Sequence, residues 1–356
     1  MDLNSDIKEK WKVKINHRNW REVCSKAFVM LTMASPGEVI CIVGPSRIGK
    51  SELIKEMSKK LNHGNKFEDS GLLPVVSVSA ANTGQNGIFQ TKSFTLRMLE
   101  AVKNPIYSSA NNFDDDFACQ KIDRKTESVL RLALERGLII RKTRFLFIDE
   151  IQHVRYTTKG SNAPCAVMES LKCLAETAQV VLVFVGTYPI LNIIENSPHL
   201  TARKHEIHFP RYYTDKEDLK EFARILMAYE EIMDLHKAVK PLVKNISMFY
   251  EGSFGCIGLL YFWLKRASAF AIAGNQKVTK KILEEAVLSY SSRKGLANEI
   301  FYGEEKIYGG KLELTNNIVE SYISNKETKI SKKKCSKPFQ RKPVRLEPGN
   351  RLHGRK

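Results

Sequence analysis

The residues of this chain most able to do chemistry form a short glycine-containing segment. Residues 44–51 read Gly-Pro-Ser-Arg-Ile-Gly-Lys-Ser, with an apolar run before them at Val39–Val43 and a helix-compatible run after them at Glu52–Leu61. In this pattern the backbone N–H groups of the loop converge on phosphates, and the following helix points its positive end at them. The sequence therefore predicts a nucleotide-binding loop made of Gly44, Pro45, Ser46, Arg47, Ile48, Gly49, Lys50 and Ser51.

A second motif supplies carboxylates for the same chemistry. The apolar run Phe145–Ile148 ends in Asp149 and Glu150, as expected of a buried parallel strand that delivers acids to the carboxyl edge of a sheet. We expect Lys50 to reach the β- and γ-phosphates of ATP, and Ser51 and Asp149 to hold Mg²⁺. Glu150 is expected to polarise the attacking water, so the pair of motifs predicts an ATPase.

Strand and helix patterns alternate over the first 210 residues. Apolar helical repeats separate the predicted strands, and this alternation indicates an α/β fold with a doubly wound parallel sheet. After Pro210 the pattern becomes helical, starting with a capping box of Thr214 and Glu217. The predicted strands are Val39–Val43, Leu73–Val78, Phe145–Ile148, Val180–Val185 and Glu206–Phe209, and the later helices are 241–250, 255–271 and 279–292.

These patterns divide the chain into four parts. Residues 1–36 form an N-terminal extension with a helix at Trp20–Met33, and residues 37–210 form the nucleotide-binding α/β domain. Residues 211–295 form a helical lid, and residues 296–356 form a C-terminal extension. Beyond about residue 325 the chain is strongly basic, so a disordered tail is predicted there.

Composition indicates the kind of partner. Lys and Arg outnumber Asp and Glu by 57 to 39, for a formal charge of +18, which suggests a polyanionic partner, with a generally basic protein as the equal alternative. Seven cysteines form no C-x-x-C pair and are expected to be reduced thiols. The sequence shows no signal peptide and no apolar stretch long enough for a bilayer, so we expect a cytoplasmic protein without a membrane partner.

Two further positions follow from the predicted order of strands. Thr187 follows the strand Val180–Val185 and would lie between the two nucleotide motifs, where it could sense the γ-phosphate; an ordinary strand-ending threonine is the alternative. Arg203 lies just before the last strand, where ring-forming ATPases carry an arginine that reaches the neighbouring subunit's site. An ordinary surface arginine is the alternative, because Lys204 and Arg211 compete for this role.

Together these motifs resemble those of AAA+ ATPases with a helical lid. More narrowly, the loop at 44–51 and the segment Asp-Glu-Ile-Gln-His at 149–153 resemble the TnsC/TniB regulators of DNA transposition over roughly residues 20–295. The resemblance implies a bacterial, ATP-dependent homo-oligomer, a ring or filament of six or seven subunits per turn, on double-stranded DNA. It also implies two partners, a transposase and a target-selection protein of the TniQ/TnsD type.

One departure from the AAA+ pattern concerns the lid. Around residues 252–258, Gly-Ser-Phe-Gly-Cys-Ile-Gly, the chain lacks the arginine that many AAA+ proteins direct at the γ-phosphate. This absence leaves the coupling of the lid to hydrolysis open.

The DNA contacts are predicted on the polar segment that follows the second strand. Thr91 and Lys92 end this segment, and small polar groups with a lysine suit phosphate contacts without base reading. Lys121 and Arg124, with Lys125, form a second candidate cluster next to three aspartates. The alternative is an ordinary solvated loop for the first segment and a charged surface for the second, and Lys92 is the preferred candidate.

Two classes of function fit these observations. The first is a weak AAA+ ATPase that assembles on double-stranded DNA and links target-site selection to transposase recruitment. The alternative is a P-loop signalling or defence NTPase that acts on a protein partner without nucleic acid. Salt-sensitive, nucleotide-dependent binding to random duplex DNA separates the two.

Overall fold

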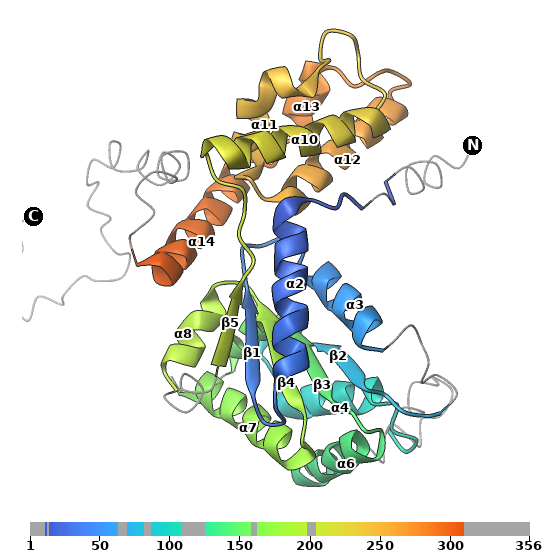
Figure 1. The fold of residues 1–356 in the computed structure, drawn as a ribbon, viewed down its shortest axis with the longest axis vertical. Coiled ribbons are helices and arrows are strands. Elements are labelled where there is room, and N and C mark those ends of the chain that lie inside the picture. Colours follow the sequence, from blue (N-terminus) through green and yellow to red (C-terminus); the bar gives the residue numbers. More distant parts are fainter. Residues whose placement is uncertain are drawn as a thin grey trace, which may run out of the picture.

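The centre of the molecule is a five-stranded parallel sheet. The computed structural model describes residues 11–12, 14–62, 70–81, 87–107, 125–157, 162–197 and 204–309. The strand order is β2-β3-β4-β1-β5, and every neighbouring pair runs parallel, so all the carboxyl ends meet at one edge (Figure 1). The strands are β1 (Val39–Val43), β2 (Val75–Ser79), β3 (Phe145–Asp149), β4 (Val181–Gly186) and β5 (Lys204–His208).

Helices cover both faces of this sheet. The apolar residues of α2 (Arg18–Met33) and α3 (Lys50–Leu61) pack with one set of strand side chains, such as Ile40 and Val183. The other face is covered by α4 (Thr91–Ala101), α6 (Glu127–Ile140), α7 (Ala163–Ala178) and α8 (Pro189–Glu195). Because β1, β3 and β4 are buried on both faces, they are nearly all apolar. The predicted doubly wound α/β fold is confirmed.

A separate helical core lies beyond the last strand. Its helices are α10 (Lys216–Ile232), η4 (Leu242–Asn245), α11 (Ile246–Ser253), α12 (Ile257–Ala273) and α13 (Lys280–Ala286). Their apolar faces bury one cluster that includes Phe222, Phe249 and Trp263. Trp11 joins this cluster and stacks on Tyr229 at 5.7 Å, so the start of the chain is attached to the helical subdomain.

Two local expectations in this subdomain are wrong. The helix expected at 279–292 is two helices, α13 and α14 (Tyr290–Tyr308), because the Ser289 side chain caps a new helix by accepting from Ser292 N–H. The expected boundary at residue 295 therefore falls inside α14. At the start of α10 the cap is Asp215, which accepts from Asp218 N–H at 3.1 Å, and not Thr214.

α14 connects the helical subdomain to the sheet domain (Figure 1). Arg211, in the segment between β5 and α10, forms a fully buried pair with Glu304 of α14, at 2.8 Å and 2.9 Å. A Cβ at Gly303 would meet the Tyr188 ring at about 2.0 Å, so α14 packs directly on that ring. These contacts hold α14 in a defined position beside the carboxyl edge of the sheet.

No single helix among the described residues is long and apolar enough to cross a bilayer. The pair Leu242–Ser253 and Ile257–Ala273 meets the criterion only when joined, across a bend of 112°.

Candidate nucleotide-binding site

The predicted phosphate loop connects β1 to the first turn of α3. Gly44 is the residue after β1 and packs against Phe209, the residue after β5. A Cβ at Gly44 would meet the Phe209 carbonyl oxygen at 2.6 Å. Gly49 has φ +121°, a conformation that L side chains rarely adopt, and α3 begins at the next residue. The loop therefore wraps around the positive end of α3, the arrangement that binds phosphate groups.

Lys50 lies inside the loop that it belongs to. Its ammonium donates to the carbonyl oxygens of Gly44 at 3.0 Å and Pro45 at 2.8 Å. Burial lowers the pKa of Lys50, and the nearby carboxylates oppose that shift, Glu299 most, then Glu150 and Asp149. The ammonium of Lys50 is thus held inside the phosphate loop, with three carboxylates nearby.

The two predicted Mg²⁺ ligands are adjacent. The Ser51 hydroxyl donates to Asp149 Oδ2 at 2.7 Å, and Glu150 N–H donates to Asp149 Oδ1 at 2.9 Å. Burial is the largest cause of a raised pKa of Asp149, with the Ser51 hydrogen bond opposing it. A hydroxyl and a carboxylate in contact are oxygen donors of the kind Mg²⁺ prefers, so this pair fits the ion.

Glu150 has an unusual backbone conformation for a non-glycine residue. Its φ is +56°, and it immediately precedes the 3-10 helix η3 (Ile151–Tyr156). Such strain, of about 1–3 kcal/mol, is found where surrounding contacts impose it, often at functional sites. The side chain of Glu150 is held by Gln152, whose amide nitrogen donates to Glu150 Oε2.

Gln152 also binds the end of β4. Its Oε1 accepts from Thr187 N–H at 3.2 Å, and a Cβ at Gly186 would meet the same oxygen at 2.4 Å. Gln152 therefore joins Glu150 to the strand end that carries Thr187. The family resemblance included Gln152, but no pattern in the sequence indicated this positioning contact.

A cavity of about 780 Å³ opens beside the phosphate loop. Its lining brings together Lys50, Glu150 and Thr187, which follow three different strands, β1, β3 and β4. α14 lines it as well, with Glu299 among its residues. The remaining lining residues are Ser46, Arg47, Gln152, His153, Arg155, Tyr188, Pro189, Asn192, Gly295, Asn298, Tyr302, Gly303 and Lys306.

The helical subdomain contacts the loop through α12. A Cβ at Gly258 would meet the Arg47 carbonyl oxygen at 1.9 Å, and the Arg47 guanidinium lies over the Phe262 ring at 4.1 Å. A second cavity, of about 420 Å³, lies where Trp20, Gly49 and Phe262 come together. The lid thus touches the loop through glycine and aromatic contacts.

The three candidates for a basic residue acting between subunits differ in where the structure places them. Arg203 lies outside the described residues. Arg211 is 0% exposed and paired with Glu304, so in this conformation it cannot reach a neighbouring subunit. Lys204 pairs with Glu206 at 2.9 Å on β5.

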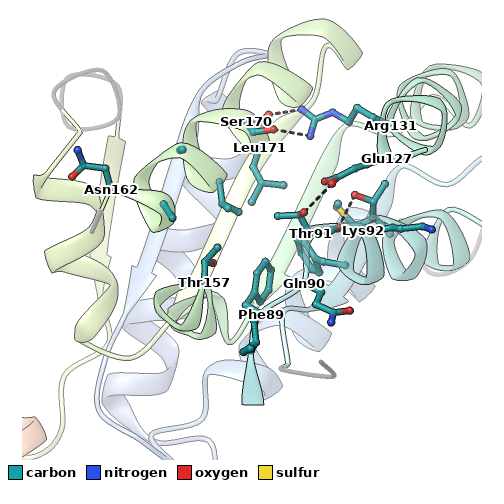
Figure 2. A pocket seen from close by; sticks show the side chains of 17 residues that line it. Phe89, Gln90, Thr91, Lys92, Glu127, Arg131, Thr157, Asn162, Ser170 and Leu171 are labelled. Carbon is teal, nitrogen blue, oxygen red and sulfur yellow. Dashed lines mark hydrogen bonds between the residues drawn. The ribbon is translucent and has the colours of Figure 1, made fainter. Parts of the chain in front are cut away.

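The predicted DNA contacts are only partly described. Lys121 and Arg124 lie outside the described residues. Thr91 begins α4 and its hydroxyl donates to Glu127 at 3.0 Å, in the lining of a cavity of about 790 Å³ (Figure 2). Lys92 also lines this cavity, and its ammonium end points away from the cavity centre (Figure 2).

Comparison with known proteins agrees with this geometry. A profile of the bacterial TniB protein family matches residues 15–214, more than half of the chain. No curated protein sequence matches. The ORC2 protein of Aeropyrum pernix has a similar structure in its ADPNP-ADP complexes, with 15% identity, a TM-score of 0.53, and coverage of 82% of this chain and 74% of that one. The ADP form of the same protein has 14% identity and a TM-score of 0.50, with coverage of 88% of this chain and 82% of that one.

The parallel sheet, the phosphate loop and the helical subdomain define the class: this is an ATPase of the AAA+ type. More narrowly, the chain belongs to the TniB family.

Proposed function

We propose that this protein is an AAA+ ATPase that assembles on double-stranded DNA in an ATP-dependent manner and links target-site selection to transposase recruitment. The observation that carries the nucleotide part is the cavity where Lys50, Glu150 and Thr187 meet beside the Ser51–Asp149 pair. The TniB family supports the transposition part. The formal charge of +18 supports a polyanionic partner.

Within this site each residue has a distinct role. Lys50 and the loop N–H groups bind the phosphates, and Ser51 and Asp149 hold Mg²⁺, which would neutralise charge on the phosphate oxygens. Glu150, held by Gln152, orients the attacking water. Thr187 lies at the end of β4 to meet the γ-phosphate.

The partners follow from the same proposal. The protein forms a homo-oligomer, a ring or a helical filament of six or seven subunits per turn, around or along duplex DNA. A target-selection protein of the TniQ/TnsD type binds the assembly, and the transposase is recruited to it in the bacterial cytoplasm. The basic C-terminal tail, which lies outside the described residues, is proposed to contact the transposase or DNA because of its charge.

The DNA part of the proposal has a direct test. Purified protein mixed with random-sequence duplex DNA and a non-hydrolysable ATP analogue should form regular rings or filaments in electron micrographs. The same mixture without nucleotide should not form them. Tight binding of the ATP analogue with no assembly and no salt-sensitive DNA binding would instead favour a signalling or defence NTPase that acts on a protein partner.

DNA affinity of the Lys92→Ala variant, measured over a range of salt concentrations, tests the predicted DNA-binding role of this lysine. If Lys92 binds a backbone phosphate, affinity should fall equally on unrelated DNA sequences. The slope of log affinity against log salt concentration should shrink by about 0.9 for each DNA phosphate that the variant no longer neutralises. Lys55, exposed on α3, gives a control lysine. A weakening confined to one DNA sequence would rule out a backbone contact at Lys92.

Arg203 is proposed to act in the site of the neighbouring subunit. Arg203→Ala should then lower the ATPase rate by about a thousandfold while isolated subunits still bind ATP, since the arginine stabilises only the transition state. Mixing Arg203→Ala with Lys50→Ala subunits should restore part of the rate, because intact interfaces form in the mixture. If no mixing ratio restores activity, the role passes to Lys204, because Arg211 is buried.

A further inference from the structure

A carboxylate of α14 is bound in the phosphate loop. Glu299 Oε1 accepts from the backbone N–H of Ser46 at 3.0 Å, and the Ser46 hydroxyl donates to both carboxylate oxygens, at 2.9 Å and 2.7 Å. Backbone N–H groups of such a loop are the donors that receive phosphate oxygens. A side chain 253 positions away along the sequence therefore occupies one of the anion-binding donors of the nucleotide site.

Glu299 lies toward the hydrolytic end of the site. It lines the same cavity as Glu150 and Thr187, the residues placed to meet the terminal phosphate. It is also the carboxylate with the strongest electrostatic effect on Lys50, ahead of Glu150 and Asp149. The negative charge of Glu299 is thus close to the position where the γ-phosphate must enter.

The surrounding contacts fix the helix that carries this carboxylate. Five residues further along α14, Glu304 forms the buried pair with Arg211. At the next turn His208 and Tyr308 are hydrogen-bonded at 2.8 Å. Because breaking a buried pair is strongly destabilising, α14 stays docked while the half-buried Glu299 side chain at its surface can turn away.

We propose that Glu299 sets the nucleotide preference of this site by competing with the γ-phosphate of ATP for the Ser46 end of the loop. This inference rests on the proposed nucleotide site and adds a residue that opposes ATP binding. ATP enters only when the Glu299 carboxylate leaves Ser46, because a carboxylate and a phosphate that share the same loop donors repel each other in a partly buried site. ADP, which lacks the third phosphate, leaves the contact between Glu299 and Ser46 intact.

Glu299→Gln is the test, because it removes the charge and keeps the shape. In calorimetric titrations the variant should bind a non-hydrolysable ATP analogue about tenfold more tightly than the wild type, a change of about 1.4 kcal/mol. Its affinity for ADP should change less than about twofold. Glu305→Gln, on the exposed side of the same helix, is the matched control and should leave both affinities unchanged.

Each outcome separates this inference from the function on which it rests. Wild-type protein that binds no nucleotide would remove both. Wild-type protein that binds ATP, with no gain in Glu299→Gln, would remove the role of Glu299 alone. An equal gain for ATP and ADP would place the carboxylate against a phosphate that both share, and weaker ATP binding would make Glu299 a supporting ligand. Glu299→Ala, with its melting temperature measured, repeats the test if Glu299→Gln does not fold.

Discussion

Lys50→Ala should abolish nucleotide binding and, with it, assembly on DNA. The Lys50 ammonium is buried within the loop and already hydrogen-bonded to two loop carbonyl oxygens, so it is in place for the phosphates. A hydrogen bond from a charged group contributes about 1.5–3 kcal/mol, and Lys50 can donate to more than one phosphate. We therefore expect ATP affinity to fall by about a hundredfold or more. Calorimetric titration with a non-hydrolysable analogue measures this loss.

The matched control is Lys55→Ala on the exposed side of the same helix. Lys55 is 74% exposed and pairs with Glu52 at 3.5 Å, so its loss should leave ATP affinity within about twofold, as for an ordinary surface ion pair. Unchanged affinity in Lys50→Ala would mean that the loop does not bind the phosphates. Equal losses in both variants would indicate a general effect of charge or of α3 stability.

Glu150→Gln should separate ATP binding from hydrolysis. The carboxylate is the group proposed to take a proton from the attacking water, and general-base catalysis contributes about a hundredfold to ten-thousandfold to the rate. The amide cannot act as a base, whereas the phosphate loop and the Ser51–Asp149 pair are left intact. We therefore expect ATP to remain bound, phosphate release to fall by at least about a hundredfold, and assemblies on DNA to last longer.

Two measurements check this assignment. Phosphate release and ATP affinity should be measured on the same preparation, with Glu284→Gln on the exposed surface of α13 as the control. Faster disassembly on DNA than in the wild type, at equal ATP, would contradict the role of Glu150. A parallel loss of binding and hydrolysis would show that Glu150 supports the fold of the loop.

The sheet was largely predictable, because its strands are marked by composition. The strand Val39–Val43 is observed with its predicted bounds, and β3 differs by one residue, because both are short apolar runs that are buried on both faces. The helix ends were less predictable. One helix was expected across residues 279–292, but the chain is extended at Val287 and Ser289 caps a second helix.

The nucleotide motifs were predictable for a similar reason. The phosphate loop is a contiguous segment, and the geometry of Gly44 and Gly49 follows from their sequence positions. The contact between Ser51 of the loop and Asp149 could be expected, although the two residues are 98 positions apart. The loop follows β1 and Asp149 ends β3, and these parallel strands end at the same edge of the sheet. The left-handed backbone conformation of Glu150 and the hydrogen bond from Gln152 to its carboxylate could not be expected, since they depend on tertiary packing.

By itself, the sequence determined the class of the protein: the strand and helix order, the phosphate loop, the acidic strand end and a positive charge that suits DNA. Tertiary structure alone decided what surrounds these motifs. It buries Arg211 against Glu304, 93 positions away, and so removes it as an arginine acting between subunits. It also brings Glu299 of α14 onto Ser46. The physical reason is that motifs are local and obey fixed spacings, whereas a helix docked from a distant part of the chain takes its position from packing.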